Sequence, residues 1–134
     1  MTLDDVRRGF KKTTDAVPTL RAFKRAAMAG TVLPTGDALD TQLPTFVYIA
    51  TVSLLDDALE LIIDAKYPGA AVGKLAQRIN FLEAKGELKD ASRLHKIRKV
   101  RNEYAHEYGR YASWSEVESL FTAMDDELRH LGVL

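Results

Sequence analysis

The sequence contains no cysteine and only three histidines among its 134 residues. Without cysteine, the chain can form neither disulfides nor thiolate zinc sites, and three scattered histidines offer little for a histidine-rich metal site. Glycine-rich phosphate loops and internal repeats are also missing, which excludes P-loop chemistry and repeat architectures. We therefore expect a protein that works without a bound metal ion or cofactor.

Long hydrophobic runs are missing as well. The longest apolar run, residues 46–55, stops at Asp56 and Asp57 and is too short to cross a bilayer. The first five residues are acidic and polar, unlike a signal peptide. With 46% apolar and 28% charged residues the composition is that of a globular protein. We expect one cytoplasmic domain over residues 1–134, with no membrane partner.

The net charge of zero hides a segregated pattern. Residues 1–30 hold 7 basic and 3 acidic side chains, and residues 85–111 hold 8 and 4. Residues 31–84 and 112–134 are acidic in compensation. The two basic segments either gather into a phosphate-attracting patch or are neutralised by acidic neighbours.

Helical periodicity runs through the chain, and no segment alternates as a strand would. Thr2-x-x-Asp5 resembles a capping box and opens a short helix. Pro18 is expected to start a second helix that ends near Gly30, and residues 30–43 are predicted to be a loop.

The segment from about Pro44 to Lys66 is apolar on almost every side, which predicts the central helix of a bundle. Its core candidates are Phe46, Val47, Ile49, Val52, Leu55, Leu59 and Ile62. Further helices are expected over about 72–86, over 90–108 with Asp90 as cap and Gly109 at the end, and after the capping box Ser113-x-x-Glu116. The fold class is all-α, an antiparallel helical bundle with its core in residues 44–131; residues 1–40 are less diagnostic.

The expected helix over 90–108 has an unusual core-facing stripe. Leu94, Ile97, Tyr104 and Tyr108 share one face, and Arg101 lies inside it. Because an arginine cannot lose its proton, burying it requires partners for its five donors. Arg101 either snorkels, pairs with an acid of the central helix (Asp56, Asp57, Glu60 or Asp64), or lines a cleft for an anionic ligand.

A second stripe of the same helix is entirely polar and carries His95, Lys99, Asn102 and His106. It is either a solvated face or a site in which Asn102 and His106, four residues apart, act together. His106 is about 140° from Arg101 on an ideal helix. The two therefore meet only through distortion, a curled arginine or a second subunit.

Arginine, asparagine and histidine together supply the types of chemical group needed to cleave RNA without a metal. Histidine can transfer protons near neutral pH, and arginine matches phosphate oxygens through its planar fork. Asparagine can orient the histidine or donate to the phosphate. The 2′-hydroxyl is the internal nucleophile, which restricts the reaction to RNA.

The string from Arg101 to Tyr108, RNEYAHEY, resembles the signature of HEPN domains, small helical proteins that include many metal-independent ribonucleases. Arg101, Asn102 and His106 match the signature, and the preceding residues 94–100 resemble the family's approach to it. The resemblance implies these three as catalytic residues. We assign Arg98, Lys99 and His95 to RNA binding.

The resemblance also implies partners. HEPN domains form homodimers in which both motifs face one cleft, and His106-Glu107-Tyr108 resembles the His-x-Tyr of toxins whose nucleotidyltransferase antitoxin adenylylates the tyrosine. Tyr108 is thus either a modification site or a packing residue. Residues 97–106 also resemble the mannitol-operon repressor branch, whose members act as regulators. The function expected is an endoribonuclease toxin, with a non-catalytic regulatory domain as the alternative.

Overall fold

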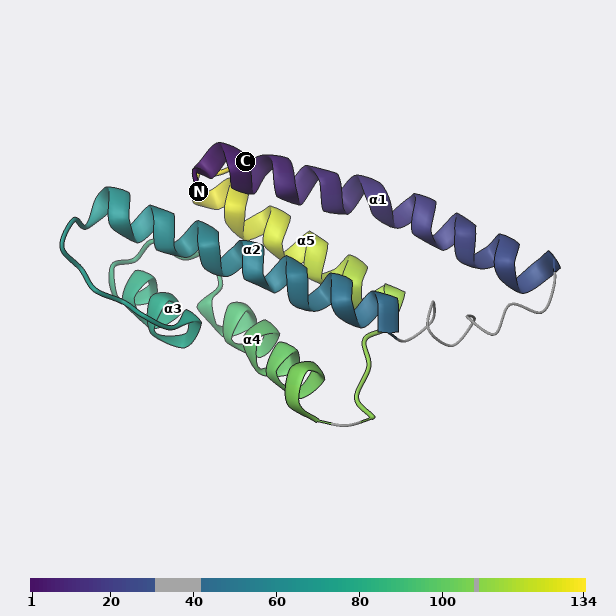
Figure 1. Ribbon diagram of the computed structural model, residues 1–134. Helices are drawn as coiled ribbons and strands as arrows, with labels where there is room; N and C mark the ends of the chain where they lie inside the picture. Colours follow the sequence, from purple (N-terminus) through teal and green to yellow (C-terminus); the bar gives the residue numbers. More distant parts are fainter. Residues whose placement is uncertain (31–41, 108) are drawn as a thin grey trace.

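The chain is all-helical in the computed structural model, which describes residues 1–30, 42–107 and 109–134. Of residues 21–30 it describes the backbone only. Within these ranges no strand occurs. The all-α class is confirmed. In chain order the helices are α1 (Leu3–Gly30), α2 (Leu43–Lys66), α3 (Leu75–Ala84), α4 (Ala91–His106) and α5 (Trp114–His130) (Figure 1).

Helix α2 is central, as its apolar sequence predicts, because it contacts α1, α3, α4 and α5. Leu55, Ala58 and Leu59 are completely buried. The expectation that Phe46 belongs to the core is wrong, since 65% of its surface is exposed. At the start of α2 the buried residues are Pro44, Thr45 and Tyr48, so Phe46 lies off the buried face of the helix.

The N-terminal segment forms one helix rather than two. The reciprocal capping box is confirmed, because the Thr2 amide donates to the Asp5 carboxylate at 2.8 Å and the Asp5 amide donates to the Thr2 hydroxyl at 3.2 Å. Helix α1 then continues through Pro18. Val6, Phe10 and Val17 are all buried at helical spacing, so one continuous apolar stripe outweighs the backbone hydrogen bond that proline removes.

The other helix ends follow their local signals with small shifts. Ser113 caps α5 by accepting from the Glu116 amide at 3.1 Å, as predicted. Helix α4 ends at His106, two residues before the expected end, and its C-cap Glu107 is already extended. Gly109 has a positive φ of 84°, so its role is to turn the chain beyond the helix rather than to cap it.

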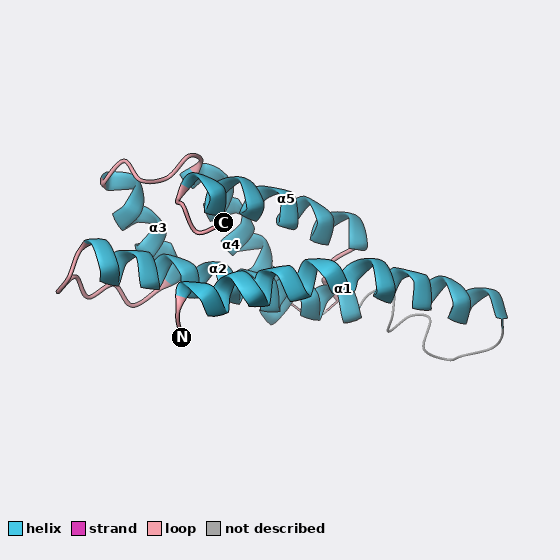
Figure 2. Cartoon of the chain, turned by 90° about the horizontal axis from the view of Figure 1, so that it is seen from above, coloured by secondary structure: helices cyan, strands magenta, loops and turns pink. Residues whose placement is uncertain are grey.

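The two orthogonal views show how the helices are arranged. Helices α3 and α4 lie on one side of α2, and the C-terminal end of α1 extends past α2 and α5 (Figure 2). The rings of Phe10 and Phe121 meet edge to face at 6.1 Å and join α1 to α5. In the part of the chain described, no helix has the length and apolarity needed to cross a membrane.

Candidate functional site

Helix α4 carries the motif, and its N-terminal end is firmly held by α5. Asp90 caps the helix by accepting from the Arg93 amide at 3.0 Å, as the sequence predicts. The carboxylate of Glu127, which is 3% exposed, accepts from the Lys89 amide at 2.7 Å and the Asp90 amide at 3.0 Å. Sequence reasoning missed this contact. The available signal is an acid on the buried face of α5, three residues after Met124 and next to Leu128.

The C-terminal end of α4 is held by aromatic and polar contacts. The Tyr104 ring packs edge to face on Tyr48 of α2 at 5.2 Å, and its hydroxyl donates to Glu116 of α5. Burial raises the pKa of Tyr48 to about 12, and the nearby Glu116 carboxylate contributes to this shift. Both ends of α4 are therefore anchored, so the motif side chains project from a rigid helix.

Arg101 is half-buried but does not pair with the central helix. Asp56 and Glu60, two of the acids expected as its partners, instead pair with Arg78 of α3. The Arg101 Nη1 donates to Asn102 Oδ1 at 3.1 Å, and its Nε is shielded from solvent with no hydrogen-bond partner. Among the described residues no carboxylate neutralises Arg101. This leaves its charge available to an anion.

His106 is exposed in the last turn of α4. It forms no hydrogen bond or ion pair with any residue whose side chain is described. Asn102 accepts from Arg101 through its side-chain oxygen and forms no hydrogen bond with His106 within the described residues. The structure thus brings Arg101 and Asn102 together and leaves His106 apart, which agrees with the wide angle predicted between Arg101 and His106.

The polar stripe of α4 borders a hollow of about 670 Å³ between α3 and α4. His95 Nε2 is hydrogen-bonded to Asn80 Oδ1 of α3 at 2.8 Å, whereas its Nδ1 is buried without a partner. The hollow is lined by Glu83, Ser92, His95, Lys96, Lys99, Val100 and Glu103. Two of the three residues assigned to RNA binding, His95 and Lys99, therefore share one surface, and Arg98 does not line it.

The positive charge of α4 is only partly compensated. Arg93 pairs with Asp126 of α5 at 3.5 Å, as expected if basic and acidic helices neutralise each other. Further along, no carboxylate in the described ranges forms an ion pair with the next four cations of the helix, which are Lys96, Arg98, Lys99 and Arg101. Arg98, like Arg101, has a buried Nε without a partner. Unpaired buried donors are uncommon in proteins and mark places where a partner is missing.

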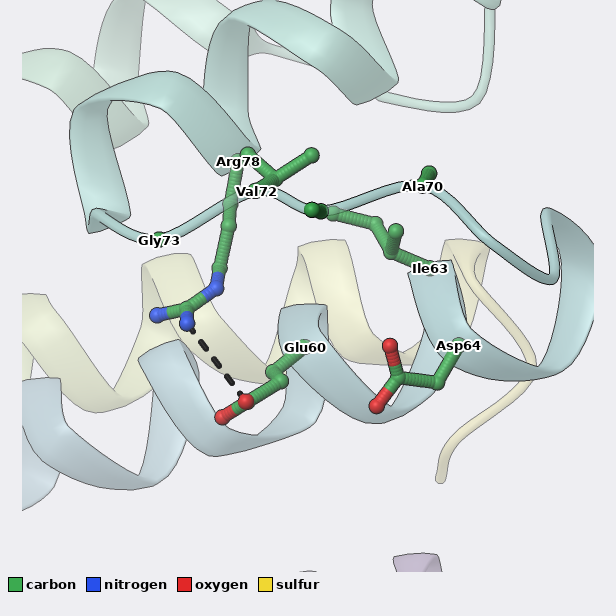
Figure 3. Close-up of a pocket in the computed structure, with 8 residues that line it drawn as sticks. Glu60, Ile63, Asp64, Ala70, Val72, Gly73 and Arg78 are labelled. Carbon is green, nitrogen blue, oxygen red and sulfur yellow. Dashed lines mark ion pairs between the residues drawn. The ribbon is translucent and has the colours of Figure 1, made fainter.

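A second cavity, of about 330 Å³, lies between α2 and the segment leading into α3 (Figure 3). Arg78 enters it from α3, and its guanidinium reaches Glu60 at 3.6 Å as well as Asp56. Burial raises the pKa of Asp57, the neighbour of Asp56 in the chain, and the carboxylates of Asp56 and Glu60 raise it further. Sequence reasoning missed Arg78, although it falls on the apolar stripe of its helix between Leu75 and Leu82.

We expect Arg78→Ala to lower the free energy of unfolding by about 2–3 kcal/mol, less than the loss of a partner from a fully buried pair, because Asp56 and Glu60 reach water. Arg93→Ala removes an exposed ion pair and should cost below about 1 kcal/mol. Urea denaturation at pH 7 measures both. Equal losses of the free energy of unfolding in the two variants would show that the ion pairs of Arg78 do not stabilise the fold.

Tyr108, the candidate modification site, lies outside the described residues.

Comparison of the chain with protein-family models, with curated proteins and with solved structures finds no match.

Proposed function

We propose that this protein is a metal-independent endoribonuclease of the HEPN type, folded as an antiparallel helical bundle, and the toxin of a toxin–antitoxin or defence system. One observation carries the proposal. Arg101, held by Asn102 and free of any described carboxylate, lies near the end of the helix whose last turn exposes His106, which engages no described side chain. A cation without a counter-ion and a free imidazole are the groups that phosphodiester cleavage requires.

In the reaction proposed, His106 accepts the proton of the 2′-hydroxyl while the 2′-oxygen attacks the adjacent phosphorus. The bond from phosphorus to the 5′-oxygen breaks, and that oxygen leaves with a proton from a general acid. The planar fork of Arg101 stabilises the negative charge that grows on the phosphate oxygens. Asn102 acts as a positioning residue, because its side-chain oxygen holds the Arg101 guanidinium.

The neighbouring cations supply attraction for the RNA backbone. Lys99 is exposed and Arg98 half-buried, and neither forms an ion pair within the described residues. Lys99 and His95 line the hollow beside α3, which Arg98 does not line, and both cations contact the RNA phosphates in this proposal. Such contacts give affinity that falls with salt and carries no sequence information.

The active form proposed is a homodimer in which α4 of each copy faces the other, because Arg101 and His106 do not meet within one chain. We expect twice the monomer mass in multi-angle light scattering at tens of micromolar protein. A monomer at these concentrations would contradict a shared cleft and would leave the two groups without a way to act on one phosphate.

We expect the purified protein to cleave RNA in EDTA and to leave 2′,3′-cyclic phosphate and 5′-hydroxyl ends, since the 2′-oxygen is the nucleophile. DNA of the same sequence lacks this hydroxyl and should stay intact. Gel electrophoresis with end-group analysis measures both, and a His106→Ala preparation purified in parallel controls for contaminating ribonucleases. Loss of cleavage in EDTA with recovery in magnesium would contradict the mechanism.

The second candidate function is a non-catalytic, dimeric HEPN-type regulatory or interaction domain similar to the mannitol-repressor branch. The observation that favours it is that His106 forms no hydrogen bond with Arg101 or Asn102 within the described part of one chain. An RNA that binds with high affinity but is never cleaved would favour the regulatory domain.

The toxin proposal further implies a nucleotidyltransferase antitoxin that modifies Tyr108.

A further inference from the structure

Two aromatic side chains remain exposed at the end of the molecule where α4 finishes. Phe46 in the first turn of α2 is 65% exposed, and Tyr111 between α4 and α5 is 45% exposed. With Met1 at the chain's start, they are the large apolar side chains that the described part of the protein leaves in solvent. Exposing a phenylalanine ring forfeits the free energy of its burial, so its position calls for a physical reason.

The fold brings these two aromatic positions together. The Ala112 amide donates to the Thr45 hydroxyl at 2.9 Å in a buried contact. Phe46 follows Thr45 in the chain, and Tyr111 precedes Ala112. Close by, the packing of Tyr104 on Tyr48 attaches the last turn of α4 to the same end of α2. Figure 1 shows the start of α2 beside the segment that runs from α4 into α5.

The surroundings of the two rings are mixed. On α2, Gln42, Ala50 and Ser53 around Phe46 are exposed, and the apolar neighbours Leu43 and Ile49 are half-buried. Tyr111 follows Arg110, whose guanidinium pairs with Glu103 at 2.8 Å. Two separate rings on a mixed surface do not form the broad apolar patch of a dimer interface. They match the platforms on which unpaired nucleic-acid bases stack.

We propose that Phe46 and Tyr111 form a base-stacking platform that holds unpaired RNA bases next to the end of α4. The platform rests on the proposed ribonuclease function, in which His106, five residues before Tyr111, acts on the RNA backbone. Stacking uses the faces of the bases, and the cations of α4 contact the phosphates. The platform therefore favours unpaired over duplex RNA without selecting a sequence.

The test measures fluorescence anisotropy of the full chain with a labelled 2′-O-methyl oligouridylate, which cannot be cleaved, and with an abasic oligonucleotide of equal length. Phe46→Leu and Tyr111→Leu keep an apolar side chain but remove the ring, whereas Phe46→Tyr and Tyr111→Phe keep the ring. We expect the leucine variants to bind oligouridylate about 5- to 100-fold more weakly. Their affinity for the abasic probe, and the salt dependence of binding, should not change.

The ring-preserving variants should bind like wild type, and Lys99→Ala should instead reduce the salt dependence for both probes. Equal oligouridylate affinity in wild type and both leucine variants would overturn the platform and leave the ribonuclease proposal untouched. Ring-dependent binding by a wild-type protein that cleaves no RNA would support the platform and reject the ribonuclease. If the leucine variants turn a dimer into a monomer without weakening RNA binding, the rings contact a second copy and the platform is wrong.

Discussion

Replacing His106 with alanine should lower the rate of RNA cleavage by about 10²–10⁴-fold, the usual contribution of a general acid–base group. The variant should fold normally, because His106 is exposed and engages no described side chain. Initial rates on a defined RNA and a thermal melt of the same preparation measure the two quantities. A large loss of activity with an unchanged melting temperature separates a role in proton transfer from a role in folding.

His130→Ala is the matched control for this variant. His130 is also exposed in the last turn of a helix, α5, so its replacement removes an equivalent imidazole from elsewhere on the surface. We expect the His130→Ala variant to cleave RNA at the wild-type rate. If His106→Ala cleaves as fast as His130→Ala, His106 is not catalytic and the motif is not the active site.

Arg101→Lys should lower the cleavage rate by about 10²–10³-fold, comparable to the loss of one donor that stabilises a developing anion. Lysine keeps the charge but cannot reproduce the planar two-pronged contact with phosphate oxygens. It also lacks the Nη1 donor geometry that engages Asn102. The deficit should appear in kcat rather than in KM, because the contact strengthens as charge grows on the phosphate.

Arg98→Lys is the matched control for Arg101→Lys. Arg98 is half-buried on the same helix, three residues earlier, and its Nε likewise has no partner. Because we assign it to backbone attraction, a point charge should suffice, and kcat should stay near the wild-type value. Equal losses of kcat in the two variants would indicate that α4 provides a diffuse positive field and that Arg101 has no special role.

Much of the helical framework could be predicted from local sequence signals. Capping boxes at Thr2 and Ser113, the cap at Asp90 and the apolar stripes depend on residues within one or two turns, so they can be recognised without any tertiary contact. The same locality explains the error at Pro18. A proline weakens a helix by a known amount, but the packing that compensates this cost comes from distant helices.

The amino-acid sequence by itself determined most of the helices, the segregation of charge and the motif's place near the end of α4. Tertiary structure alone decided which charges are neutralised: Arg78, not Arg101, pairs with the acids of α2. It also left Phe46 uncovered beside Tyr111. The physical reason is that partners across helices depend on how each helix is rotated and shifted against its neighbours. Periodicity along one helix shows which face is buried, but not which neighbouring residue covers each position of that face.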